Sequence, residues 1–332
     1  MKYSVIVPVY NRPDEVEELL ESLSKQVFRD FEVIIVEDGS SRPCEKAVEK
    51  YRDSLDIRYY YKDNSGPGLT RNYAAAKATG EYLIFLDSDV MVPGGYFEAI
   101  EEEAPADAFG GPDREHPSFT PMQKAISYAM TSFFTTGGIR GGTKRLDRFF
   151  PRSFNMGIKR YIFNNLGGFS GMRFGEDIDL SIRIFEAGYT CRLFPQAWVW
   201  HKRRTDLKKF FRQVFNSGIA RINLYKRHPG SLKLVHVLPS LFTIGCALLV
   251  TGTILHRATL IPIGVYAMLI LIDSFAAHRK DREVVTIALY SVAAAFVQLI
   301  GYGSGFLSAW WQRCVLKKGD ESLQAFKNNF YK

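Results

Sequence analysis

The sequence is poor in cysteine, with only Cys44, Cys191, Cys246 and Cys314 among its 332 residues. The four lie far apart, and no two of them form a CxxC pair. Disulfide-linked small domains and structural zinc sites need paired or closely spaced cysteines, so neither class is supported. We expect all four cysteines to be reduced.

A secretory signal is also missing at the N-terminus. The first apolar stretch, within MKYSVIVPVYNR, is too short for the core of a signal peptide, and polar residues follow it at once. The composition, with 46% hydrophobic residues, is not that of a disordered chain. We therefore expect a globular first domain that stays in the cytoplasm.

Positive charge is in excess, with a formal net charge of +8. Nucleic acid, a phosphorylated small molecule and an acidic lipid surface are all compatible with this excess. A dense basic run over residues 202–233 directly precedes the first long apolar segment. That position favours anionic membrane lipid, and we predict no nucleic-acid partner because no recognition module is apparent.

Short β-branched or aromatic runs alternate with helical patterns in the first part of the chain. The helix between the first two runs has apolar residues at Val16, Leu19, Leu20 and Leu23, and a second helix is expected near residues 69–80. The runs predicted as strands are residues 3–7, 31–36, 57–61 and 82–86. The pattern predicts an α/β fold with a doubly wound, mostly parallel sheet, which binds ligands beyond the carboxyl ends of its strands.

The second part of the chain is dominated by long apolar segments. Three nearly uncharged stretches, 234–255, 258–277 and 284–308, are each long enough to cross a bilayer of about 30 Å. Before them, residues 205–233 carry an apolar stripe beside basic residues, which predicts an interfacial helix; an ordinary amphipathic helix packed on the globular domain is the alternative. The expected organisation is a catalytic domain (1–204), an amphipathic basic interfacial segment (205–233), about three transmembrane helices (234–308) and a basic tail (309–332). The expected location is a multi-pass protein of the cell inner membrane or plasma membrane.

The charges around the apolar segments do not agree on one topology. Arg279, Lys280 and Arg282 place the loop between the second and third segments inside, in agreement with a cytoplasmic catalytic domain. Three full crossings would nevertheless put the basic tail outside. The glycines at 301, 303 and 305 offer a bend or re-entrant path, so the side of the tail stays open. The segment 112–151, with its glycine tracts, is expected to be an irregular loop region.

Asp87, Ser88 and Asp89 follow the apolar run YLIFL. Two carboxylates separated by one residue at a strand end offer oxygen ligands to Mg²⁺ or Mn²⁺, which also bridge a diphosphate. A solvated turn is the alternative interpretation of such a triplet.

Two further motifs are expected at the same edge of the sheet. Glu37 and Asp38 end the strand FEVIIV, where a carboxylate can accept hydrogen bonds from a nucleobase or ribose. Pro8, Tyr10 and Arg12 end the first strand and bring an aromatic ring and a cation. Arg71, at the start of the second helix, is suited to phosphate oxygens.

In the order and approximate spacing of its motifs, the sequence resembles the family 2 glycosyltransferases, an inverting class with the GT-A fold. The resemblance covers about residues 1–220. It rests on PVYNR at 8–12, EDGS at 37–40, GPGLTRN at 66–72, DSD at 87–89 and GEDIDL at 175–180. It implies a glycosyltransferase of the hexosyltransferase type that transfers sugar from a nucleotide diphosphate, with UDP the usual nucleotide and GDP or dTDP left open.

The resemblance also implies roles for individual residues. Asp38 would contact the base in a pocket lined by Pro8, Tyr10 and Arg12, and Arg71 would lie near the diphosphate. Asp89 would bind the metal most directly, and Asp87 would contact the ribose or the metal. His201 would approach the same ion.

Catalysis and the acceptor side are assigned by the same resemblance. Asp177 would take the proton from the acceptor hydroxyl as general base, with Glu176 as the alternative, and an acidic first turn of a helix as the non-catalytic interpretation. Asp179 is interpreted as positioning or structural. The residues expected to flank the acceptor are Asn155, Met156, Gly157 and Gly168, although these glycines could equally form turns.

The expected partners are a nucleotide-sugar donor, a lipid-linked or membrane-associated glycan acceptor in cell-surface polysaccharide or glycan biosynthesis, and anionic lipid. One rival is a polyprenyl-phosphate glycosyltransferase, which would use a lipid phosphate as acceptor. A glycoside hydrolase has paired carboxylates but no need of EDGS or Arg71. A non-catalytic membrane scaffold with a sugar-nucleotide-binding domain is the rival from another class. No RW dipeptide follows Gln213, which argues against a processive polysaccharide synthase.

Overall fold

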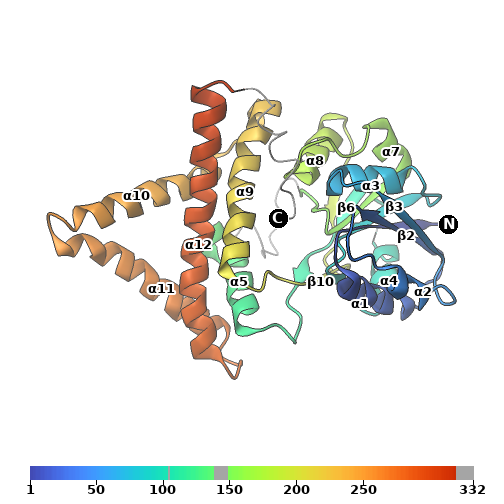
Figure 1. Cartoon of the computed structure of the whole chain (residues 1–332), viewed down its shortest axis with the longest axis horizontal. Coiled ribbons are helices and arrows are strands. Elements are labelled where there is room, and N and C mark those ends of the chain that lie inside the picture. The colour runs from blue at the N-terminus through green and yellow to red at the C-terminus, as the bar shows by residue number, and fades with distance from the viewer. Residues whose placement is uncertain (104, 138–148, 319–332) are drawn as a thin grey trace. The chain divides into compact units, whose positions relative to one another are not determined.

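The computed structural model describes residues 1–103, 105–137 and 149–318, and it separates into two compact units (Figure 1). Within the described residues, the first unit contains 1–116 and 149–202, and the second contains 117–137 and 203–318. The expected catalytic domain of residues 1–204 differs from the first unit because residues 117–137 pack with the C-terminal helices. The glycine tract at 138–142, part of the expected loop region, lies outside the described residues.

The first unit is built on a seven-stranded sheet with the order β3-β2-β1-β4-β8-β6-β9. The first four strands are parallel where they pair, and β8 runs antiparallel to both β4 and β6, so the sheet is mixed. Its strands are β1 (Tyr3–Val9), β2 (Phe31–Asp38), β3 (Ile57–Lys62), β4 (Tyr82–Leu86), β6 (Ala108–Gly110), β8 (Asn155–Lys159) and β9 (Cys191–Leu193). This is the GT-A-like α/β architecture expected from the sequence.

Both faces of this sheet are covered by helices. Alternate residues of one strand enter different apolar clusters, with Val5 and Val7 in one and Ile6 in the other. The first cluster includes residues of α1 (Pro13–Ser24), α2 (Glu45–Glu49) and α4 (Tyr96–Glu101). The second includes residues of α3 (Pro67–Ala75), α7 (Arg160–Asn165) and α8 (Glu176–Glu186). The sheet is therefore doubly wound.

A small second sheet completes this unit, with β10 (Val199–His201) between β5 (Val90–Met91) and β7 (Asp113–Arg114). Because β5 begins directly after the DSD triplet, its pairing with β10 brings His201 opposite Val90. Residues more than a hundred positions apart in the sequence thereby reach the carboxyl end of β4.

The second unit contains two helices in the region expected to be irregular. They are α5 (Pro121–Thr131) and α6 (Phe133–Thr136). Thr120 and Gln123 form a capping box at the start of α5, with Pro121 in the first turn, which fixes where this helix begins. The expectation of a loop was therefore wrong for this part of the chain.

The remaining helices of the second unit are α9 (Leu207–Arg227), α10 (Leu238–Gly252), α11 (Ile261–Ala277) and α12 (Val284–Trp310). Short helical turns connect or extend them: η1 (Pro229–Ser231), η2 (Leu234–His236), η3 (Arg257–Leu260) and η4 (Trp311–Val315). Among the described residues, three helical segments are long and apolar enough to cross a membrane: Leu234–Gly252, Arg257–Ala277 and Val284–Val315.

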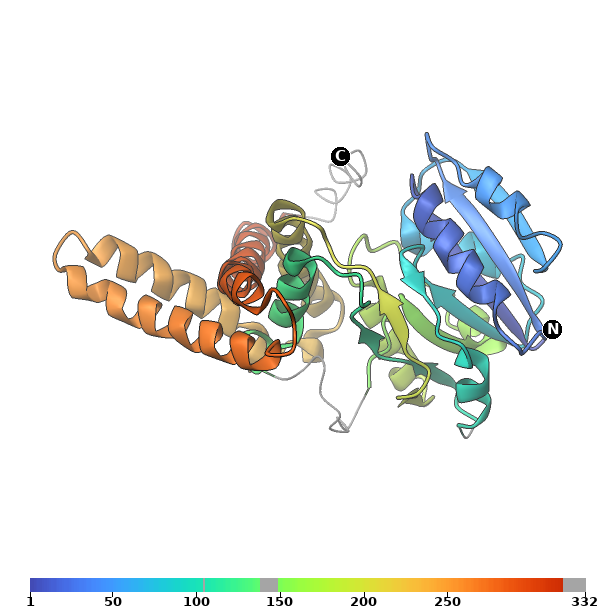
Figure 2. The same cartoon turned by 90° about the horizontal axis from the view of Figure 1, so that it is seen from below.

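The apolar stripe of α9 lies against α12, and the two helices run side by side in both views (Figures 1 and 2). Phe210 and Val214 of α9 are buried with Ala294 of α12. This part of the expected interfacial stripe therefore packs against another helix of the same chain. The α12 glycines permit this approach, since a Cβ at Gly305 would lie 2.0 Å from the Phe215 carbonyl oxygen. The helix continues through these glycines from Val284 to Trp310.

Candidate active site

The loops that follow β1 and β2 are joined by Asn11. Its backbone N–H donates to the Ser40 hydroxyl at 2.9 Å, and its side-chain oxygen accepts from the N–H groups of Ser41 and Arg42 at 2.8 and 2.9 Å. Asn11 has φ of 56°, a left-handed conformation that asparagine tolerates better than most residues. Asn11 therefore sets the PVYNR segment beside the EDGS segment.

Asp38 ends β2 and is 1% exposed. Its carboxylate accepts from Lys62 at 2.6 Å and from the N–H groups of Ser65 and Gly66 at 2.8 and 2.9 Å. Gly66 is the N-cap of α3, so Asp38 connects β2 to the start of the helix that carries Arg71. The residues expected around Asp38 lie close to the strand end: Pro8 is within β1 opposite Val36, and Tyr10 follows β1 directly, half-buried.

Glu37 lies inside the protein, beneath the loop that follows β2. Its carboxylate is fully buried, accepts from the Ser40 hydroxyl, and also accepts from the Cys44 N–H at 2.6 Å. Burial, reinforced by the nearby Glu37 charge, raises the pKa of the Cys44 thiol and of the Tyr59 hydroxyl. We therefore assign Glu37 to holding the loop after β2 and no longer to nucleotide contact.

Asp87, Asp89 and His201 are brought together at the carboxyl end of β4. One ligand atom from each lies within 4.8 Å of the others. The Nε2 atom of His201 is 3.3 Å from Asp89 Oδ1, and its Nδ1 atom is 4.0 Å from the Asp113 carboxylate. Two carboxylates and one imidazole form a donor set that suits a divalent cation. Ser88, between the two carboxylates, is buried.

Each carboxylate of the DSD triplet also meets a guanidinium. Arg12 forms an ion pair with Asp89. Arg71 donates to Asp87 at 2.6 Å and to Glu176 at 3.0 Å, while it is only 3% exposed. The Arg71 guanidinium also lies 5.5 Å from the centre of the Phe169 ring. Arg71 thus joins the end of β4 to the start of α8.

Glu176 and Asp177 form the first turn of α8. Gly175, with φ of 82°, supplies the left-handed turn before it. Burial, together with the adjacent Asp177 charge, raises the pKa of Glu176 to about 7, while Arg71 acts in the opposite direction. Asp177 is 9% exposed, and one of its oxygens is 3.4 Å from the Nε atom of Arg152.

Asp179 lies deeper than its two neighbours. It is fully buried and forms an ion pair with Arg183 at 2.9 Å. Arg183 then donates to the carbonyl oxygens of Leu166 and Gly168 at 2.6 and 2.7 Å. These contacts support the structural role expected for Asp179, which is to hold the turn after α7.

The four residues expected on the acceptor side contact other parts of the same unit. Met156 is fully buried, and a Cβ on Gly157 would lie 2.1 Å from the Phe109 ring. Asn155 accepts from the Tyr96 hydroxyl at 2.6 Å and donates to the Ala197 carbonyl at 2.7 Å. Gly168, with φ of 69°, forms a turn, and a Cβ there would meet the Asn72 amide oxygen at 2.6 Å. These contacts give the four residues packing roles, and their place on the acceptor side stays a prediction.

Three site residues were missed in the sequence. Lys62 binds Asp38, Arg152 lies beside Asp177, and Asp113 lies beside His201. The position of Lys62 at the end of the third parallel strand was an available signal. Arg152 and Asp113 lie in or next to the region interpreted as an irregular loop, where the sequence gave no reason to place them near the site.

The chain is similar to several known proteins. The sequence model of the family described as "Glycosyl transferase family 2" matches residues 4–174. The succinoglycan biosynthesis protein ExoA of Rhizobium meliloti is 23% identical over 79% of this chain and 82% of its own length. The poly(ribitol-phosphate) β-N-acetylglucosaminyltransferase TarS of Staphylococcus aureus is 40% identical over 35% of this chain, but the match spans only 20% of TarS.

A solved structure is similar over most of the chain. It is the mannosyltransferase PcManGT from Pyrobaculum calidifontis in complex with GDP-Man and Mn²⁺, with a TM-score of 0.60 and 20% identity, over 90% of this chain and 87% of that one. At this identity, the similarity establishes the shared fold.

Proposed function

The chain belongs to glycosyl transferase family 2 and is a glycosyltransferase, and on this basis we propose that it transfers a sugar with inversion from a nucleotide diphosphate to a hydroxyl of a membrane-associated glycan. One observation carries the proposal. Asp87 and Asp89 are held beside His201 at one strand end, and Arg71 connects the same end to the Glu176–Asp177 turn.

The donor side would be formed by the ends of β1, β2 and β4. Asp38 would bind the base or ribose, because it is the carboxylate at the end of the strand next to β1. Asp87, Asp89 and His201 would hold Mn²⁺ or Mg²⁺, which supplies positive charge for the departing diphosphate. Arg12 and Arg71 form ion pairs with Asp89 and Asp87. Two guanidinium groups are therefore available to phosphate oxygens beside the proposed metal site.

Asp177 is our choice for the general base. Inverting transfer needs one carboxylate to accept the proton of the acceptor hydroxyl while its oxygen attacks the anomeric carbon. Glu176 is held by Arg71 and retains a proton up to near neutral pH, which suits a positioning role. Asp177 has a less buried carboxylate, whose only direct ion pair among the described residues is with Arg152 at 3.4 Å.

The acceptor is proposed to be a glycan carried on lipid. Three helices of suitable length and apolarity follow the catalytic unit, which implies membrane association. The names of two relatives concern poly(ribitol-phosphate) and succinoglycan, both polymers, and this supports a glycan acceptor. We further propose that the catalytic unit is on the cytoplasmic face, where nucleotide sugars are available.

A donor screen with the purified full-length chain tests the proposal. Each nucleotide sugar is incubated with Mn²⁺ or Mg²⁺, and the released nucleoside diphosphate is measured. We expect release from one donor class only in the presence of metal and acceptor-containing membranes. Nucleotide-sugar binding without any release in such membranes would favour the non-catalytic scaffold, and a lipid monophosphosugar product would favour the polyprenyl-phosphate enzyme.

A further inference from the structure

We propose that α10 and α11 cross the bilayer as a hairpin, whereas α12 lies along the membrane surface on the side from which the chain enters. All three segments are apolar enough to cross, so composition alone does not distinguish them. The packing inside the second unit does distinguish them. This inference concerns the membrane contact and does not depend on the sugar transferred.

The charges on α9 form the first line of evidence. Phe210 of α9 packs with Ala294 and Val297, which are near the middle of α12. Farther along, Ile222 packs with Phe306, so the two helices run in the same direction. If α12 stood across the membrane, α9 would be carried into the hydrocarbon beside it.

The cost of that arrangement is high. The three basic residues on either side of Phe210 are exposed, namely Lys208, Lys209 and Arg212. Each charged residue near the bilayer centre costs about 2.5–3.5 kcal/mol on insertion scales. Along the surface, the same side chains reach lipid phosphates and water. The α9 charges therefore favour a surface position for the α9–α12 pair.

The position of α5 is the second, independent line of evidence. Ile126 and Ala129 pack with Ala294, and Tyr128 packs with Ala295, so α5 touches the middle of α12. An upright α12 would therefore place α5 beside it in the hydrocarbon. A surface-lying α12 keeps α5 at the membrane surface.

The hairpin differs from α12 in its surroundings. Within an apolar window of 18 residues in each segment, only 6% of the α10 window and 11% of the α11 window are buried within the protein, compared with 39% for α12. Both views show α10 and α11 leading away from α12 to a shared tip (Figures 1 and 2). The segments contain 19 and 21 residues, which corresponds to about 30 Å of helix. The tip carries the exposed His256 and Arg257, which reach the opposite surface only if the hairpin crosses completely.

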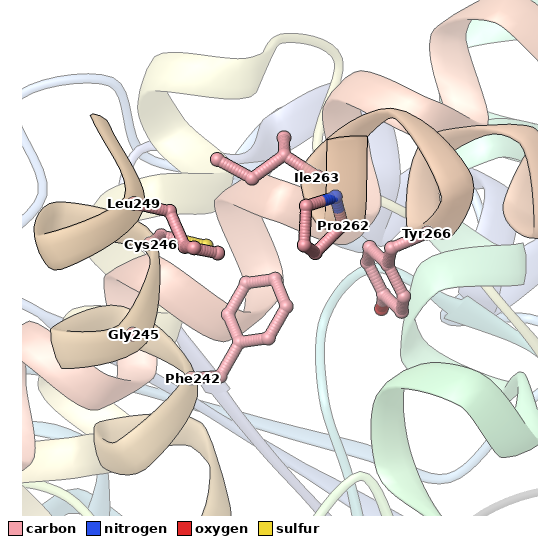
Figure 3. Close-up of a pocket in the computed structure, with 7 residues that line it drawn as sticks. All are labelled: Phe242, Gly245, Cys246, Leu249, Pro262, Ile263 and Tyr266. Carbon is pink, nitrogen blue, oxygen red and sulfur yellow. The ribbon is translucent and has the colours of Figure 1, made fainter. Parts of the chain in front are cut away.

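The inner faces of the hairpin also suit hydrocarbon. Phe242 and Leu249 of α10 face Ile263 and Tyr266 of α11 across a hollow of about 230 Å³ (Figure 3). No charged side chain lines it. An apolar hollow of this size is a poor site for water, which needs polar partners. A lipid chain fills it when the hairpin is immersed in the bilayer.

This topology also reconciles the flanking charges. Arg279, Lys280 and Arg282 precede α12, and Arg313, Lys317 and Lys318 follow it. With α12 on the surface, both groups lie on the same side, as the positive-inside bias requires. The glycines of α12 then serve helix packing, as at Gly303, where a Cβ would lie 2.4 Å from the Pro239 carbonyl oxygen.

Cysteine labelling of the full-length chain tests the topology. Ala258→Cys marks the tip, Lys280→Cys marks the loop before α12, and Lys318→Cys marks the end after it; all three positions are exposed. A membrane-impermeant maleimide is applied to intact spheroplasts and to inverted vesicles, and peptide mass identifies the labelled cysteine. We expect Ala258→Cys to react only in spheroplasts and the other two only in inverted vesicles. Labelling of Lys318→Cys from the side opposite to Lys280→Cys, or of Ala258→Cys from the same side, overturns the proposal.

A pair of lysine substitutions tests immersion separately. Val265 and Ala293 are exposed positions within α11 and α12. We expect Val265→Lys to reduce the carbonate-resistant membrane fraction at least fivefold, whereas Ala293→Lys changes it less than twofold. An equal loss in both variants would mean that α12 is immersed as deeply as α11, which contradicts the proposal.

Discussion

Arg71 donates a hydrogen bond to Glu176 at 3.0 Å, although 105 residues separate the two in the sequence. The same guanidinium donates to Asp87 at 2.6 Å, so a single side chain connects the end of β4 with the first turn of α8. Arg71 is 3% exposed, and burying a charge is costly unless it is paired. The proposed metal ligand and the proposed catalytic turn are therefore held in register by one buried cation.

Replacement of Arg71 should damage stability and catalysis together. At pH 8, above the pKa of about 7 at which Glu176 loses its proton, Arg71→Leu leaves a buried carboxylate without its cation, and breaking a buried pair in this way costs about 3–5 kcal/mol. Chemical unfolding of the full-length chain in detergent measures this loss. The double variant with Glu176→Gln should recover part of it, because the unpaired charge is removed as well. If the two substitutions are simply additive, Arg71 and Glu176 are not coupled.

Asp177→Asn should separate donor binding from turnover. The amide keeps the shape of the side chain but cannot accept the acceptor proton, so we expect kcat to fall by about 10²- to 10⁴-fold. Donor affinity should stay within about threefold, because the donor ligands lie elsewhere in our proposal. Asp53→Asn, an exposed carboxylate in the same unit, is the matched control. Normal turnover in Asp177→Asn would remove this residue from the base role.

The sheet was predictable because each of its first four strands can be recognised from its own short stretch of sequence. β1 to β4 are short apolar runs bounded by turn residues, and the motifs at their ends follow from the rule for parallel sheets. The structure accordingly brings Asp87, Asp89 and His201 together. His201 was placed by resemblance, since only the β5–β10 pairing brings it to Asp89.

The surroundings of individual side chains could not be predicted from the sequence. Gly157 and Gly168 were assigned to the acceptor, yet one faces the Phe109 ring and the other the Asn72 side chain. Glu37 directly precedes Asp38 at the end of β2, but its carboxylate accepts from the Cys44 N–H. Adjacent strand residues point to opposite faces, and the sequence does not say which face carries the site.

Asp89→Ala should abolish metal-dependent donor binding. It removes a carboxylate from the Asp87, Asp89 and His201 cluster and leaves Arg12 without its ion-pair partner. Calorimetric titration with Mn²⁺ and nucleoside diphosphate should show loss of the metal-dependent part of the affinity. His201→Ala, which leaves both carboxylates, should weaken metal binding less. Undiminished Mn²⁺ dependence in Asp89→Ala would exclude this carboxylate as a ligand.

Glu37→Gln and Asp38→Asn should have different effects, although the residues are adjacent. Glu37 serves the loop after β2, so Glu37→Gln should lower the free energy of unfolding by about 1–3 kcal/mol and leave donor affinity within about twofold. Asp38→Asn should weaken nucleotide binding at least tenfold. Thermal unfolding and nucleotide titration of both variants measure the two effects. A tenfold loss of affinity in Glu37→Gln would restore it to the nucleotide site.

The pH dependence of stability should report on Glu176. Its pKa is raised from the usual 4.5 to about 7, first by burial and then by the Asp177 charge, so the folded protein holds a proton that the unfolded chain releases. This contribution to stability is fully present below about pH 4.5 and is lost as the pH rises through about 7.

The measurement compares wild type with Glu176→Gln, which cannot titrate, by thermal unfolding of the full-length chain in EDTA between pH 5 and pH 8. Wild type should lose stability relative to the variant as the pH rises across this range. Added Mn²⁺ should reduce the difference, because a nearby divalent cation favours the ionised carboxylate. Parallel curves for the two proteins would mean that Glu176 already carries its charge at pH 5.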